Sequence, residues 1–135
     1  MEDFVNFKLA QKLKEKGFSL EKTEIYGIFD SDGLFHSQLY FNYIETMDCD
    51  EIIAPTISQV LKWLRKEKKI HITANIYQDE SEDADGRIVD KWRFWNWNIQ
   101  SCISGNFLQE EDGVEYESYE SAIFAGIEYA TNNLI

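Results

Sequence analysis

The chain has 135 residues, of which 44% are hydrophobic and 15% aromatic, and its 25 acids against 13 bases give a net charge of −12. Its 9 Phe, 7 Tyr and 4 Trp exclude an intrinsically disordered chain, because such chains contain few aromatic residues. The acidic balance argues against binding of duplex DNA, because a phosphate backbone repels an acidic surface. The length predicts a single domain over residues 1–135 that needs no disulfide or metal to fold.

The sequence also bears on the compartment. No run approaches the roughly 18–20 apolar residues of a membrane span, and the acidic start at Met1–Phe4 lacks the features of a signal peptide. Cys49 and Cys102 lie far apart without a CxxC spacing, which is typical of two free buried thiols in a reducing environment. We therefore expect a cytoplasmic protein that has no membrane partner.

The first predicted element is an amphipathic helix over about residues 3–16. Its apolar stripe includes Val5, Leu9 and Leu13, which recur every four residues. Gly17 and Phe18 then have the composition of a Schellman stop, in which glycine takes a left-handed conformation.

The next elements form a hairpin. Residues 24–29 and 34–42 favour strands, and the acidic segment 30–33 with Gly33 between them favours a turn. The segment 43–54 has no clear period and predicts a loop.

A second helix begins after Thr56, which forms a capping box with Gln59. Its apolar stripe consists of Ile57, Val60, Leu61 and Leu64. Five bases crowd its C-terminal half, where the helix dipole favours cations: Lys62, Arg65, Lys66, Lys68 and Lys69.

A second hairpin pattern follows this helix. Residues 70–77 alternate as a half-buried strand, the polar run 78–87 predicts a long loop, and residues 88–102 predict a long strand. The apolar parity of the last strand changes between Phe94 and Trp95. This change predicts either a β-bulge or a strand that is covered on both faces.

The chain closes with a helix over about residues 119–132, for which Ser118 is the N-cap. Gly126 in its interior costs about 1 kcal/mol of helix propensity, so we expect close packing against a strand or helix there. The order α-ββ-α-ββ-α predicts an α+β domain whose antiparallel sheet carries the helices mainly on one face.

Known catalytic and metal-binding motifs are missing from the sequence. The acidic loops before Gly33, Gly86 and Gly113 lack the glutamate at position 12 of an EF-hand and fit solvated turns. His36 and His71 have no metal-ligand spacing, and nothing local supports a triad with Cys49. We expect neither a cofactor nor catalysis, although a site assembled from distant residues stays open.

The most unusual stretch runs from Lys91 to Asn98 and mixes cations with aromatic residues. It fits a core strand, a platform for single-stranded nucleic acid or sugar, or a self-association surface. The candidate interaction residues are Trp63, Trp92, Arg93, Trp95 and Trp97.

Charge is distributed unevenly along the chain. Residues 23–61 hold seven acids and no base, and residues 101–135 do the same. Residues 62–70 hold five bases and one acid. This polarity fits a solvated acidic surface, or one that imitates nucleic acid or meets a basic partner.

Three parts of the chain carry a resemblance to a known group. They are KLKEKGF at 12–18, APTISQVLKWLR at 54–65 running into IHI at 70–72, and YESYESA at 116–122 with Gly126–Ile127. The pattern resembles small uncharacterised proteins of gut anaerobes, often encoded by their phages or mobile elements. The resemblance implies an intracellular protein and supplies no catalytic or ligand residues.

These observations favour a non-enzymatic protein-binding or accessory module with a protein partner, and a homodimer is a candidate assembly. One alternative is a nucleic-acid mimic that inhibits a DNA-binding host enzyme, motivated by the two acidic segments. Another is a single-strand nucleic-acid binder that uses the second helix and the Lys91–Trp97 strand.

Overall fold

The secondary structure follows the predicted pattern with two added strands. The computed structural model describes residues 4–19, 26–38, 51–109 and 114–135. Its elements are α1 (Phe7–Glu15), β1 (Tyr26–Phe29), β2 (Phe35–Gln38), β3 (Ile52–Ala54), α2 (Ile57–Glu67), β4 (Ile70–Glu82), β5 (Ile88–Ser101), β6 (Phe107–Gln109) and α3 (Tyr119–Asn133). All strands pair antiparallel. The α+β class is therefore confirmed.

The strands form two sheets where a single one was expected. Their orders are β2-β1-β3 and β4-β5-β6. Strand β3 lies in the segment that was predicted as a loop, and it pairs with β1 from Gly27 opposite Ala54 to Phe29 opposite Ile52. Such a short pairing depends on a partner distant in sequence, so the local pattern of residues 43–54 does not reveal it.

Helix α1 begins later than predicted. Phe4 forms an isolated antiparallel bridge with Thr56, which keeps the chain before the helix extended. Asn6 is the N-cap, and its Oδ1 accepts a hydrogen bond from the backbone N–H of Leu9 at 2.8 Å. Tertiary pairing thus sets the helix start.

The predicted end of α1 and the predicted starts of α2 and α3 are confirmed. Phe18 donates its backbone N–H to the carbonyl of Leu13 at 2.9 Å across Gly17, whose φ is +85°. Thr56 and Ser118 cap α2 and α3, each within a complete capping box. These caps satisfy backbone donors that would otherwise be unpaired at the helix ends.

Helix α3 packs directly on β4 and β5 through Gly126. An added Cβ at Gly126 would lie 2.9 Å from Cγ2 of Ile72 and 3.3 Å from Cβ and Cγ of Trp97. The expected close approach is confirmed, and it explains why the helix contains glycine. Each large side chain buried here contributes about 1.5–3 kcal/mol to folding. The core also includes Leu9, Leu13, Val60, Leu64, Ile70, Ile99, Ile123 and Ile127.

Strand β4 is longer than predicted. It continues to Glu82 through most of the polar run that predicted a loop, which leaves residues 83–87 as the turn. The β4–β5 pairing is regular past Phe94 and Trp95, and the register of this strand pair shifts between Ser81 and Glu82. The change in apolar parity between Phe94 and Trp95 is therefore not caused by a β-bulge. Instead, aromatic residues point to both faces of β5.

Candidate interaction surface

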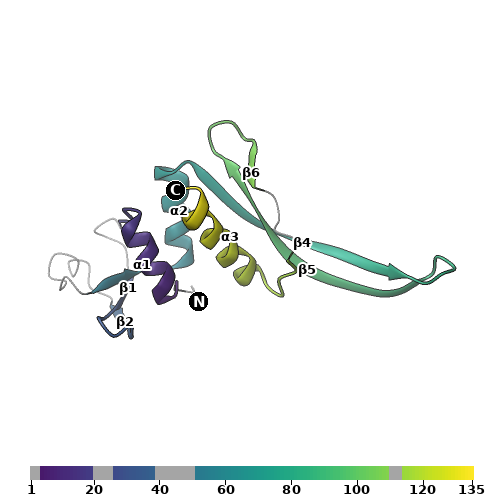
Figure 1. Cartoon of the computed structure of the whole chain (residues 1–135), viewed down its shortest axis with the longest axis horizontal. Helices are drawn as coiled ribbons and strands as arrows, with labels where there is room; N and C mark the ends of the chain where they lie inside the picture. Colours follow the sequence, from purple (N-terminus) through teal and green to yellow (C-terminus); the bar gives the residue numbers. More distant parts are fainter. Residues whose placement is uncertain (1–3, 20–25, 39–50, 110–113) are drawn as a thin grey trace.

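Hairpin β4–β5 projects from the rest of the molecule. Its strands have 13 and 14 residues and pair continuously from Ile70 opposite Ser101 to Ser81 opposite Asp90. Figure 1 shows α3 lying along the half that begins β4, whereas the other half extends far beyond the helices. We call residues 77–94 the arm.

The arm is closed by a turn that an aspartate side chain holds. Oδ1 of Asp83 accepts hydrogen bonds from the backbone N–H groups of Asp85 at 2.9 Å and Arg87 at 3.0 Å. Gly86 has a φ of +78°, a left-handed conformation that glycine adopts without steric cost. The sequence DADGR therefore specifies the turn.

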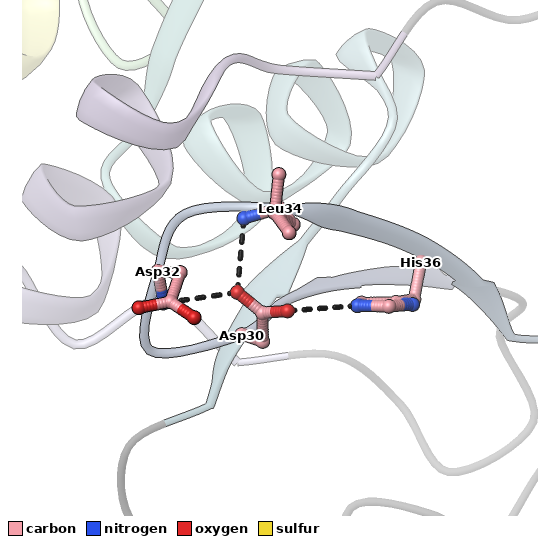
Figure 2. A network of polar contacts seen from close by, with 4 residues as sticks. All are labelled: Asp30, Asp32, Leu34 and His36. Carbon is pink, nitrogen blue, oxygen red and sulfur yellow. Dashed lines mark hydrogen bonds and ion pairs between the residues drawn. The ribbon is translucent and has the colours of Figure 1, made fainter.

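The first hairpin uses the same chemistry, as Figure 2 shows. Oδ1 of Asp30 accepts from the backbone N–H groups of Asp32 at 2.9 Å and Leu34 at 3.0 Å. His36 adds an Nε2–H donor to Oδ2 at 2.9 Å. The pKa of Asp30 lies below its usual 3.8. The hydrogen bond from His36 is the largest cause, and the hydrogen bond from the backbone of Leu34 is the next. Both acidic turns thus use a carboxylate to hold the backbone.

One face of the arm continues the core face of the sheet. Near the helices it carries Ile76, 52% exposed, opposite the half-buried Trp95. Farther out, Glu80 lies opposite Lys91 and Arg93 lies opposite a glutamine. Acids and bases therefore mix on this face.

The other face combines aromatic rings with carboxylates. The rings of Tyr77 and Phe94 lie opposite each other and stack with centroids 5.7 Å apart. Trp92, two residues from Phe94, lies opposite Asp79, and its Nε1–H donates to Oε1 of Glu115 at 3.2 Å. We call this the aromatic–acidic face, formed by Tyr77, Asp79, Asp90, Trp92, Phe94 and Glu115. None of these six residues is basic.

The structure separates the five predicted interaction residues. Trp63 and Trp97 are only 7% and 2% exposed, so they belong to the core. This corrects the prediction that they form part of a contact surface. Trp95 is half-buried, and its ring contacts Tyr119 edge-on at 5.7 Å. Trp92 and Arg93 lie on the arm, but on opposite faces.

Sequence reasoning missed Tyr77, Asp79, Asp90 and Glu115. The signal was the alternation of residues 77–81 as a strand, because it places Tyr77 and Asp79 on one face with Trp92 and Phe94. The polar composition hid this signal, since a hairpin exposed on both faces has no apolar alternation. Glu115 joins the face only through the folded chain.

The candidate catalytic groups do not form a site in the described residues. His71 is half-buried, and its Nδ1 is buried without a hydrogen-bond partner among the described residues. Cys102 is free and exposed, contrary to the expected buried thiol, and Cys49 lies outside the described residues. No group of three or more His, Cys, Asp or Glu that could hold a metal occurs among the residues the structure describes.

Helix α2 carries exposed basic side chains on one face. Lys62, Arg65 and Lys66 are exposed at positions i, i+3 and i+4, away from the buried Val60 and Leu64. Nζ of Lys68, the C-cap residue, lies 5.4 Å from the ring centroid of Trp63. We call Lys62, Arg65 and Lys66 the basic stripe.

Comparisons with known proteins add no assignment: the chain matches no family model, no curated protein and no solved structure. No helix within the described ranges is long and apolar enough to cross a membrane.

Proposed function

We propose that this chain is a non-enzymatic protein-binding module, and that the arm contacts the partner. The observation that carries the proposal is the projection of a long hairpin away from the helices (Figure 1), together with the large apolar side chains that it exposes to solvent. Ile76, Tyr77, Ile88 and Val89 are 52%, 40%, 48% and 63% exposed, and all lie on the arm or directly beside it.

Energetics support a contact role for the arm. A two-stranded hairpin alone in water is only marginally stable, so a long arm without helices on it has little to hold its far half. The Tyr77–Phe94 pair contributes about 0.5–1.5 kcal/mol. Docking on a partner would bury the exposed side chains and stabilise the arm further.

The nucleic-acid alternatives have weaker support. A single-strand platform needs stacking rings beside cations, whereas Asp79, Asp90 and Glu115 surround the rings of the aromatic–acidic face. A nucleic-acid mimic needs an unbroken stripe of carboxylates, whereas Lys91 and Arg93 interrupt the acids on the other face.

We further propose that the protein acts in the cytoplasm of a gut anaerobe, as one of the phage- or mobile-element-associated proteins that the chain resembles. The acidic composition fits a stable, highly charged accessory protein.

A shortened arm tests the proposal. Deletion of Tyr77–Glu80 and Lys91–Phe94 removes four paired residues from each strand, including the Tyr77–Phe94 pair and Trp92, and keeps the DADGR turn and the strand alternation. We expect the thermal midpoint of unfolding to change little, because the core is untouched. From a gut-anaerobe lysate to which untagged chain has been added, tagged wild type should retain at least one protein that the variant loses, and equal retention by both would contradict the proposal.

A further inference from the structure

Two surfaces of this chain are chemically complementary. The aromatic–acidic face offers Asp79, Asp90 and Glu115 beside three aromatic rings. The basic stripe on α2 offers Lys and Arg side chains, which bind carboxylates by charge-assisted hydrogen bonds and aromatic faces by cation–π contact.

The spacings of the two surfaces are within reach of long basic side chains. Asp90 lies opposite Ser81 and is therefore the diagonal cross-strand neighbour of Asp79, about 7–8 Å away. Lys62 and Lys66 are one helical turn apart, about 6 Å along α2. A helix laid along the arm could therefore place successive basic residues beside successive carboxylates.

The two surfaces do not meet within one copy. Helix α2 packs beside the first residues of β4, whereas the arm extends to the opposite end of the molecule (Figure 1). Two copies related by a two-fold axis could each place the arm on the other's α2. Such a reciprocal contact forms two identical interfaces in one closed dimer.

We infer that the arm docks on the basic stripe of α2 in a second copy of this chain, giving an arm-exchanged dimer. The inference rests on the proposed function, because it names the partner of the same arm. Two copies each carry a charge of −12, which opposes association. At 0.15 M salt the Debye length is about 8 Å, so the repulsion between distant acidic groups of the two copies is largely screened. The close pairs between the arm and the basic stripe are screened less.

Charge reversal with matched controls tests the inference. Asp79→Lys alters the aromatic–acidic face, and Glu80→Lys makes the same change on the other face. Arg65→Glu alters the basic stripe, and Lys14→Glu does the same in the last turn of α1. Light scattering and sedimentation at 0.15 M and 1 M salt give the dimer dissociation constant of each variant.

We expect the wild type to dimerise at 0.15 M salt and to dissociate at 1 M. Asp79→Lys and Arg65→Glu should each weaken the dimer about tenfold, because both symmetric contacts lose an attraction. Glu80→Lys and Lys14→Glu should stay within about twofold of wild type. An equimolar mixture of Asp79→Lys and Arg65→Glu should form a heterodimer of nearly wild-type affinity, since both of its contacts are attractive again.

Three results would overturn the inference. The first is a wild type that stays monomeric at high concentration and at both salt levels. The second is a dimer that all four variants weaken equally, and the third is an equimolar mixture that does not restore the dimer. The proposed function fails separately, when the shortened-arm variant retains both the untagged chain and the lysate proteins as wild type does.

Discussion

Gly126 provides the sharpest quantitative test of the packing between α3 and the long hairpin. Replacement by alanine gains about 1 kcal/mol of helix propensity. The new Cβ would lie 2.9 Å from Cγ2 of Ile72, closer than real Cβ contacts, and 3.3 Å from Cβ and Cγ of Trp97. Both neighbours are buried core side chains, at 4% and 2% exposure, so neither can swing into solvent.

Overpacking of this kind costs about 1–3 kcal/mol. After the propensity gain, we expect Gly126→Ala to destabilise the fold by about 1 kcal/mol, which lowers the thermal midpoint by roughly 3–5 °C for this chain length. Ala125→Gly, on the neighbouring half-buried position, is the control for propensity and should cost about 1 kcal/mol.

A double-mutant cycle isolates the contact. Ile72→Ala removes Cγ2 and costs about 2–5 kcal/mol by itself. In that background Gly126→Ala should become stabilising by about 0.5–1 kcal/mol, because the methyl group enters the space that Ile72 left. Urea denaturation followed by Trp fluorescence and circular dichroism measures each free energy of unfolding. An equal effect of Gly126→Ala in both backgrounds, or a stabilised single variant, would refute the reasoning.

Three further predictions concern caps, turns and the first sheet. Thr56→Ala should cost about 1 kcal/mol by chemical denaturation, because α2 loses its N-cap. Gly27→Ala places a Cβ against the Phe35 ring, but that ring is 42% exposed and can swing out, so we expect a loss of only about 0.5–1.5 kcal/mol from broken ring contacts. Because the folded pKa of Asp30 lies below 3.8, the stability it contributes is present above that pH and is lost as the pH falls through the folded pKa. Asp30→Asn should abolish this acid-dependent step in thermal melts, whereas a step of unchanged size would exclude the contact with His36 as its origin.

Local chemistry explains which parts of the fold the sequence could predict. Thr56 with Gln59 and Gly17 with Phe18 act through hydrogen bonds within a few residues, so their patterns suffice to place helix ends. The start of α1 was misplaced because the Phe4–Thr56 bridge joins positions distant in sequence. Strands β3 and β6 depend in the same way on their partners β1 and β5.

The candidate site was harder to predict because tryptophan is large enough to serve either core or surface. Trp97 lies under α3 and Trp92 lies on the arm, although both stand in one short aromatic run. Strand parity places them on opposite faces, but sequence alone did not say which face α3 covers. The position of Gly126 against Trp97 supplies that missing information.

The two faces of the arm differ in a way that solvation alone does not require. An arm that only needed solubility would be served by intermixed charges on both faces, as Glu80 and Lys91 are mixed on one of them. On the other face, carboxylates gather around Tyr77, Phe94 and Trp92 without a base among them. The parts of these rings that stay in solvent, most of all Tyr77 at 40% exposure, cost hydrophobic free energy that burial against a cationic partner would recover. This segregation of charge on a projecting hairpin is therefore the main reason to seek the function of the chain in what the arm touches.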